Sequence, residues 1–157
     1  LEYMEKFRAS YITKDIDFLE QLFSEDALII VGKVVKKAPE NRARYFSTEQ
    51  IVYNLKSKRE YINRLKHVFE ANQKIQINFS RFQIKRHPTI PGIYGVTVRQ
   101  GYTSDLYSDE GYLFLLWDFR NSQAPQIHVR TWQPTLLDNN TPLPEQEIFS
   151  IRNFNIE

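Results

Sequence analysis

The sequence is poor in the residues that build several common active sites. It has no cysteine, and it has five glycines and three histidines in 157 residues. The lack of cysteine excludes disulfides, thiol catalysis and thiolate metal sites. The glycines form no phosphate-cradling loop, the histidines lack metal-ligand spacing, and no nucleophile-elbow pattern supports a serine triad. The sequence therefore predicts no metal and no cofactor.

A strong charge excess and a long apolar run are also missing. The formal net charge is +2, far from the dense basic stripe typical of nucleic-acid binding. No apolar run approaches the roughly 18 residues of a membrane-spanning helix. With 41% hydrophobic and 14% aromatic residues, the chain still has enough material for a buried core. We expect one compact domain with no nucleic-acid partner and no transmembrane segment.

The first residues already follow a helical pattern, with apolar side chains at Tyr3, Met4, Phe7 and Tyr11. Because the chain starts at Leu1 rather than at a methionine, we expect that a signal peptide, a tag or another domain preceded it. The absence of cysteine does not separate the cytosol from an exported compartment, so the localisation stays open.

The stretch Thr13 to Val31 predicts a second helix that runs directly into a strand. Asp15 is a typical N-cap, since its carboxylate accepts from amides of the first turn. Ser24-Glu25-Asp26 ends the helix, and the apolar run 27–31 predicts a buried strand. The apolar face of this helix consists of Ile16, Leu19, Leu22 and Phe23.

A third helix is predicted after Ser57, because Ser57 and Glu60 have the spacing of a capping box. Asn72 is a plausible end for this helix. Its apolar stripe consists of Tyr61, Ile62, Leu65, Val68 and Phe69.

Beyond residue 74 the apolar period falls from 3.6 to 2, which predicts strands. The alternation shifts parity near Ser80-Arg81, as a β-bulge would cause. Turn-rich segments then separate strands at 93–103, 112–119 and 126–133, and short connections make these strands antiparallel neighbours. Residues 135–157 read as a C-terminal extension with a possible edge strand.

An amphipathic helix followed by an acidic residue, a second helix, Asp26-Ala27 and a strand resembles the nuclear transport factor 2-like superfamily. Its cone-shaped, cystatin-like domains include SnoaL-like and ketosteroid-isomerase-like proteins, and the sequence resembles uncharacterised bacterial members. The resemblance covers residues 1–134. It implies an α+β fold in which N-terminal helices pack on a strongly bent antiparallel sheet, with residues 1–157 forming a single domain. The superfamily contains both enzymes and non-catalytic domains, so the fold does not define the function.

The candidate site is the inner face of the bent sheet, where the superfamily usually has its pocket. His128, Arg130 and Trp132 alternate along one strand and are expected to share a face, with Asp118 opposite His128. A carboxylate, an imidazole and a guanidinium together suit acid-base chemistry, so Asp118, His128 and Arg130 are the catalytic candidates. The candidate ligand-binding residues are Arg99, Asp118, His128, Arg130 and Trp132.

Two alternatives remain for this set of residues. It equally fits a surface ion-pair ladder, which commonly stabilises sheets, or the contact face of a dimer. Three tyrosines are further candidates whose face depends on the register: Tyr94, Tyr102 and Tyr112.

The chemistries that the resemblance implies do not match these residues well. Isomerase-like and cyclase-like enzymes keep a catalytic Asp or Tyr inside the cone, and the strand 126–133 carries no carboxylate. Epoxide-hydrolase-like sites need a second buried Asp, and dehydratase-like sites need paired histidines. His67 and His87 are expected to be structural or exposed.

The densest charge cluster follows the first strand and is expected to be a solvated hairpin or loop, with contact to an anionic partner or a membrane surface as the alternative. It consists of Lys33, Lys36, Lys37, Arg42 and Arg44.

Two functional hypotheses follow from the sequence. The first is a non-catalytic binding or interaction domain that holds a small apolar or aromatic ligand in the cone and forms a homodimer through its sheet. The alternative is a small-molecule isomerase, lyase or cyclase.

Overall fold

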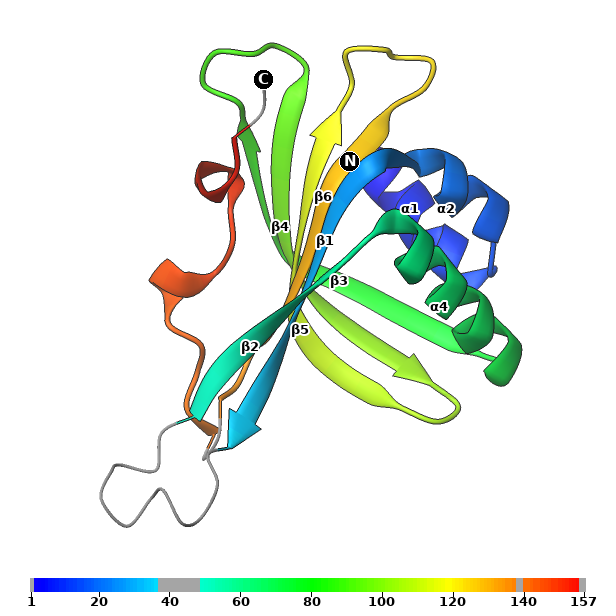
Figure 1. Cartoon of the computed structure of the whole chain (residues 1–157), viewed down its shortest axis with the longest axis vertical. Helices are drawn as coiled ribbons and strands as arrows, with labels where there is room; N and C mark the ends of the chain where they lie inside the picture. Colours follow the sequence, from blue (N-terminus) through cyan, green and yellow to red (C-terminus); the bar gives the residue numbers. More distant parts are fainter. Residues whose placement is uncertain (1, 37–48, 138–139, 156–157) are drawn as a thin grey trace.

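The computed structural model describes residues 2–36, 49–137 and 140–155. In these ranges three α-helices pack on one side of a six-stranded sheet (Figure 1). The helices are α1 (Glu2–Ile12), α2 (Ile16–Leu22) and α4 (Lys58–Ala71). The strands are β1 (Phe23–Lys36), β2 (Glu49–Lys56), β3 (Ile75–Arg86), β4 (Ile93–Ser104), β5 (Ser108–Asp118) and β6 (Gln126–Pro134). No helix in the described ranges is long and apolar enough to cross a membrane.

The sheet has the strand order β2-β1-β6-β5-β4-β3 and is mixed. The meander β3 to β6 is antiparallel, as predicted, but β1 and β6 pair in parallel, so the expectation of a purely antiparallel sheet is wrong at this one ladder. The reason is the long connection through β2, α4 and three strands, which returns the chain beside β1 in the same direction. The predicted α+β class is confirmed.

The caps predicted for α2 and α4 are present. Asp15 accepts a hydrogen bond of 3.1 Å from the amide of Phe18, and Ser57 and Glu60 form both bonds of the capping box. Phe23 is the first residue of β1 rather than the last of the helix, so β1 starts before the acidic turn and is longer than predicted.

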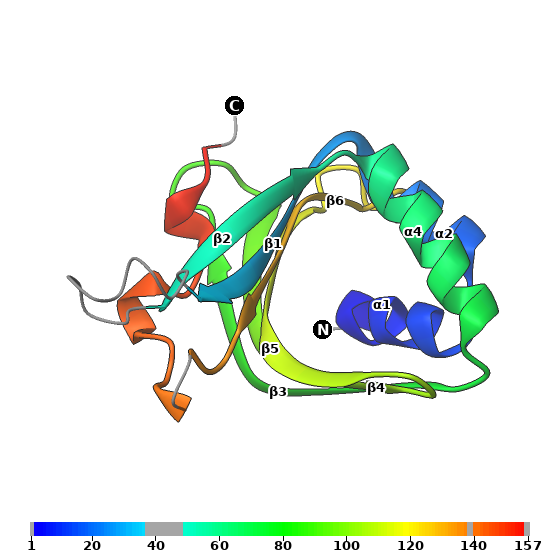
Figure 2. The same cartoon turned by 60° about the horizontal axis from the view of Figure 1, so that its bottom comes forward.

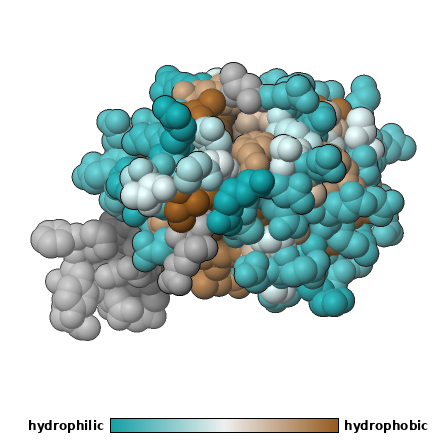
Figure 3. All heavy atoms as spheres, turned by 90° about the horizontal axis from the view of Figure 1, so that it is seen from above, coloured by the Kyte–Doolittle hydropathy of each residue, from teal (hydrophilic) through white to brown (hydrophobic). Residues whose placement is uncertain are grey.

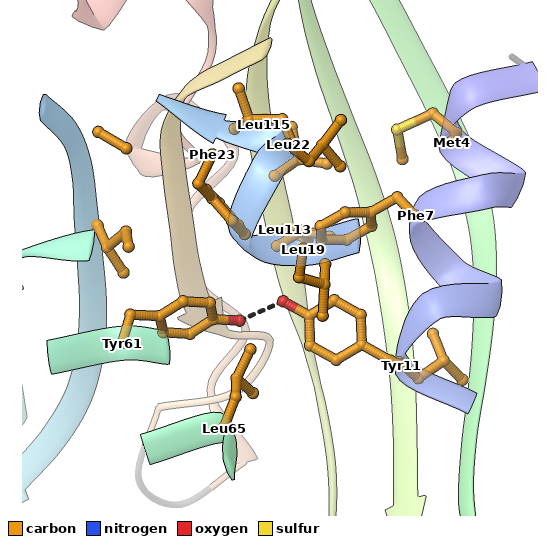
Figure 4. Close-up of a cluster of buried hydrophobic side chains, with 14 of the residues drawn as sticks. Met4, Phe7, Tyr11, Leu19, Leu22, Phe23, Tyr61, Leu65, Leu113 and Leu115 are labelled. Atoms are coloured by element: carbon orange, nitrogen blue, oxygen red, sulfur yellow. Dashed lines mark hydrogen bonds between the residues drawn. The ribbon is translucent and has the colours of Figure 1, made fainter. Parts of the chain in front are cut away.

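Strong curvature gives the sheet its cone shape. In β3 the register shifts between Ser80 and Gln83, and Arg81 has a φ of 54°, so the bulge predicted at this point is confirmed. Figure 2 shows the sheet curling around α1, while α2 and α4 lie across the open side. Aromatic and aliphatic side chains from the helices and the sheet fill one end of the cone (Figure 4).

The C-terminal segment, residues 135–155, crosses the sheet face opposite the helices (Figures 1 and 2). It contains the short 3-10 helices η2 (Glu145–Glu147) and η3 (Ile151–Asn153) and no strand in its described part, so the expected edge strand is wrong. Its apolar side chains are instead used for packing. Phe149, Ile151 and Phe154 pack against a buried cluster of Ile93, Phe114, Leu116 and Val129.

The basic cluster after the first strand is only partly described. Lys33 and Lys36 belong to β1, which continues further than the sequence predicted, so this part of the cluster is strand rather than loop. Lys37, Arg42 and Arg44 lie outside the described residues.

Candidate functional site

The open end of the cone contains a pocket of about 650 Å³. Its walls come from α1, α4, the turn between β4 and β5, and every strand of the sheet. A volume of this size is typical of small-molecule sites. The apolar and aromatic part of the lining consists of Tyr11, Val31, Tyr61, Leu65, Val68, Ile77, Tyr102, Leu106, Tyr107 and Trp132.

Arg130 lies at the base of this pocket, where β6 pairs with Ile29 of β1. It is only 9% exposed, and its guanidinium lies 4.9 Å from the centroid of the Tyr61 ring, a cation-π contact. Its Nε is buried and has no hydrogen-bond partner. Burial alone would lower the pKa of Arg130, but Tyr61, Tyr11 and the carboxylate of Asp109 outweigh it and raise that pKa.

Two tyrosines from different helices meet beside Arg130. The hydroxyls of Tyr11 on α1 and Tyr61 on α4 are hydrogen-bonded to each other (Figure 4). Burial, and then the neighbouring Tyr61, raise the pKa of Tyr11 well above its usual value. The Tyr11 hydroxyl therefore stays neutral, and the two hydroxyls provide a polar floor next to the cation.

Asp109 of β5 supplies the carboxylate of the pocket. Its Oδ1 is buried without a hydrogen-bond partner. Burial raises the pKa of Asp109, although interactions with Tyr107 and Arg130 act in the opposite direction. Partial burial, and then the Asp109 carboxylate, raise the pKa of Tyr107 to about 12. A partly buried carboxyl with a raised pKa is a common feature of functional sites.

The rim of the pocket is fixed by hydrogen bonds between segments far apart in the sequence. Asp105, in the turn after β4, accepts bonds of 2.6 and 3.1 Å from the amides of Gln73 and Lys74. The side-chain oxygen of Asn72 accepts a hydrogen bond from the amide of Leu106. The backbone carbonyl of Asn72 accepts one from the Lys14 ammonium. These contacts hold the turn between β4 and β5 against the end of α4.

Trp132 forms a wall of the pocket because the facing strand has no side chain there. The indole lies directly over Gly111 of β5, in the space that a Cβ would occupy. Glycine at this position therefore sets the position of the indole.

The structure brings Asp118 and His128 together, but away from Arg130 and Trp132. His128 Nε2 lies 2.8 Å from Asp118 Oδ2. The register of β5 and β6 shifts between Leu116 and Trp117, which makes His128 an extra residue in its strand. The expectation that all four side chains share one face is therefore wrong: the bulge interrupts the strict alternation on which it depended.

The Asp118-His128 pair lies beside a second hollow, of about 450 Å³, at the C-terminal segment. His128 Nδ1 is 3.0 Å from the hydroxyl of Ser24, which is 4% exposed and does not line the hollow. Hydrogen bonds from Arg120, and then from His128, hold the pKa of Asp118 well below its usual range against the effect of burial. The three side chains therefore suit a structural link between β1, β5 and β6. The Ser24 hydroxyl is buried, so a substrate cannot reach it.

Arg99 does not line the cone pocket either. It forms an ion pair with Glu110 of β5. His67 is exposed on α4, and His87 Nδ1 accepts amide bonds from Thr89 and Ile90 in the turn before β4, so the two histidines have the roles expected of them. Among the described residues no group of three or more His, Asp or Glu side chains is placed to hold a metal ion.

Asp109 is not among the residues that the sequence predicts for the site, because the segment 104–111 has the composition of a turn. The strand β5 in fact starts at Ser108. The signal was the period of two that links Asp109, Gly111, Leu113 and Leu115, which places the carboxylate on the inner face. Gly111 interrupts this pattern in the sequence, since glycine usually indicates a turn.

Comparison with known proteins defines the fold. No protein-family model matches the sequence, and no curated protein matches it in sequence. Solved structures do match: an NTF2-like protein from Cytophaga hutchinsonii has a TM-score of 0.61 and 12% identity over 85% of this chain and 93% of that one. A putative ketosteroid isomerase from Shewanella frigidimarina has a TM-score of 0.55 and 12% identity over 84% of this chain and 92% of that one. The chain thus has the NTF2-like, cystatin-like cone fold.

A third structure, Bd1075 of Bdellovibrio bacteriovorus, has a TM-score of 0.60 and 16% identity over 92% of this chain. The match spans only 40% of that protein, so the chain is equivalent to less than half of its length. At these identities the likeness shows the fold and no more.

Proposed function

We propose that this chain is a binding domain that holds a small ligand with an apolar or aromatic body in its cone. The observation that carries the proposal is the pocket of about 650 Å³ whose walls are aromatic and aliphatic and whose base carries a few polar groups. Small-molecule sites typically combine these two features. The fixed rim supports the proposal, because a preformed pocket loses little entropy when a ligand binds.

Buried polar atoms without a hydrogen-bond partner also favour the cone pocket as the ligand site. In the part of the chain that the structure describes, four buried side-chain polar atoms lack a hydrogen-bond partner, and two of them, Asp109 Oδ1 and Arg130 Nε, belong to residues that line this pocket. Buried polar groups are normally paired, so two unpaired atoms on residues that line one cavity support a ligand site there. A larger hollow of about 820 Å³, between β3, β4 and the C-terminal segment, has no such atom in its lining.

Calorimetric titration with two naphthalene derivatives tests the proposal. We expect at least one of 2-naphthoate and 2-naphthalenemethanol to bind with a micromolar to low millimolar dissociation constant. Val68→Trp, which adds a large ring inside the pocket, should abolish binding. The control Leu136→Trp adds the same ring at an exposed position outside it and should leave binding intact. Failure of both compounds to bind, or equal binding by the Val68→Trp variant, would contradict the proposal.

An isomerase, lyase or cyclase is a second candidate, and one observation favours it. Asp109 is a carboxyl with a raised pKa inside the pocket. A carboxyl with a raised pKa is a better proton donor and acceptor for catalysis than an unperturbed one. The role that the sequence assigned to Asp118 and His128 would then belong to Asp109. Exchange of solvent deuterium into a carbonyl compound bound in the cone, lost in Asp109→Asn, is the expected result for an enzyme.

The homodimer through the outer sheet face stays a prediction. The C-terminal segment covers part of that face, so a second copy would have to bind beside it. Large exposed hydrophobic residues are distributed over β2, β3, the turn after β4 and the loop after β6: Val52, Leu55, Phe82, Ile84, Leu106, Tyr107 and Leu136. In the view of Figure 3, apolar atoms likewise form patches separated by hydrophilic ones. Light scattering at tens of micromolar should give the mass of two chains, and a single-chain mass would contradict the dimer.

A further inference from the structure

The charges in the cone pocket are strongly unbalanced. Four cationic residues contribute to its lining, namely Lys33, Lys56, Arg64 and Arg130, whereas Asp109 is the only carboxylate among the described residues that line it. Over the described residues of the whole chain, basic and acidic side chains are nearly balanced, so this concentration is local. An excess of one sign in a low-dielectric cleft raises the local concentration of ligands of the opposite sign.

Among these four cationic residues, Arg130 indicates where in the pocket an anion would bind. A guanidinium that is 9% exposed normally has an anionic partner, because an unpaired buried charge is costly. Here no carboxylate of a described residue lies within 4 Å of Arg130, and Asp109 is close enough to influence its pKa but forms no ion pair with it. The contacts that Arg130 does have are with the side chains of Tyr61 and Tyr11 rather than with a carboxylate.

We propose that the ligand of the cone carries a carboxylate, which binds the guanidinium of Arg130 while its apolar or aromatic body lies against Trp132 and Val68. This inference rests on the proposed function and adds the chemical class of the ligand. A planar carboxylate fits a guanidinium by charge-assisted hydrogen bonds, and it would supply the anionic partner that Arg130 lacks among the described residues.

Asp109 favours a single negative charge on that ligand. Asp109 lines the same pocket, and as a carboxylate it would repel an anion bound to Arg130. A monoanion reduces this repulsion compared with a phosphate dianion. The carboxylate is therefore the anion that best fits both side chains.

The test compares 2-naphthoate with 2-naphthalenemethanol, which has a similar shape but no charge. In the wild-type chain we expect 2-naphthoate to bind roughly tenfold to a hundredfold more tightly, the range that charge-assisted hydrogen bonds provide. This comparison needs no variant and so cannot be confused with misfolding. Equal binding of both compounds, each blocked by Val68→Trp, would overturn the carboxylate assignment and leave the binding domain standing. Failure of both compounds would overturn the two proposals together.

Two variants then locate the anion. Arg130→Met should remove the preference for 2-naphthoate, whereas the matched control Arg59→Met, at an exposed position of α4 outside the lining, should retain it within about threefold. Asp109→Asn should tighten 2-naphthoate binding at least threefold and leave the neutral compound unchanged, since it removes only charge repulsion. A preference that survives in Arg130→Met, or weaker naphthoate binding in Asp109→Asn, would overturn the assignment. Should Arg130→Met not fold, Arg130→Lys replaces it, with partial loss of the preference expected.

Discussion

Arg130 lies with its guanidinium 4.9 Å from the ring centroid of Tyr61, and the hydroxyl of that same Tyr61 is hydrogen-bonded to Tyr11. One aromatic side chain therefore has two functions: its face stabilises a buried cation, and its edge connects α4 to α1. The fold and the base of the pocket are coupled through this residue.

The tyrosine pair should behave as a coupled unit in a double-mutant cycle. Tyr11→Phe and Tyr61→Phe each leave one buried hydroxyl without its partner, at a cost of about 1 to 3 kcal/mol in the free energy of unfolding. The double variant leaves neither hydroxyl unpaired and should lose clearly less than the sum. Urea denaturation measures all four proteins. Strictly additive losses would show that the hydrogen bond contributes nothing.

Gly111→Ala should displace Trp132. Its Cβ would overlap the indole, so the ring must move or the strands must separate, and overpacking of this kind costs about 1 to 3 kcal/mol. Gly101→Ala is the matched control, because no atom lies within 4 Å of a Cβ at that position. Denaturation curves and tryptophan emission report the two effects. If Gly111→Ala proved as stable as Gly101→Ala, with unchanged emission, the packing described would be contradicted.

Asp118 should stabilise the chain in a pH-dependent way. Its pKa is lower in the folded state than in an unfolded chain, so its contribution is complete above about pH 5 and is lost as the pH falls through the acidic range. Asp118→Asn should therefore lower the melting temperature at pH 7, and the difference from wild type should shrink towards about pH 2. A difference that stays constant between about pH 7 and pH 3 would show that ionisation of this carboxyl is not involved.

His128→Ala should affect stability rather than binding in the cone. The imidazole connects Ser24 to Asp118 and lines a different hollow from Arg130. We expect a loss of about 1 to 3 kcal/mol in the free energy of unfolding, from the buried partners left unpaired. Titration with 2-naphthoate should give the wild-type dissociation constant. A tenfold weaker affinity in a folded variant would place His128 in the binding site after all.

Phe149→Ala should loosen the C-terminal segment without unfolding the cone. Phe149 is partly buried, against Tyr53 and Phe154, so the loss should stay below the roughly 3 to 5 kcal/mol of a fully buried phenylalanine. Hydrogen exchange should increase in residues 143–155 and remain slow in β5. Equal acceleration in β5 would show that the segment is part of the main cooperative unit.

Local signals in the sequence predict most of the helices and the meander. The cap at Asp15, the capping box at Ser57 and the parity change near Ser80 each depend on residues a few positions apart, and each is present in the structure. The parallel pairing of β1 with β6 joins segments about a hundred residues apart, and no local pattern encodes it.

The candidate site was predicted less well, for a physical reason. The prediction of one shared face depends on strict alternation of side chains along β6. His128 is an extra residue in that strand, and it separates the Asp118-His128 pair from Arg130. Of the predicted ligand-binding residues, only Arg130 and Trp132 line the cone pocket. Asp109 was not predicted, because the nearby Gly111 gives its segment the composition of a turn. The packing of Phe149 and Phe154 on the outer face of the sheet could not be predicted from periodicity either. The described part of the C-terminal segment forms no strand, so its apolar residues do not alternate.

A crystal structure of the chain grown with 2-naphthoate would show directly whether the cone binds a carboxylate at Arg130. We expect the naphthalene rings inside the cone beside Trp132, with a carboxylate oxygen within about 3 Å of a guanidinium nitrogen of Arg130. A cone that holds only solvent, or a naphthoate bound at the outer hollow beside β3 and the C-terminal segment, would contradict this assignment.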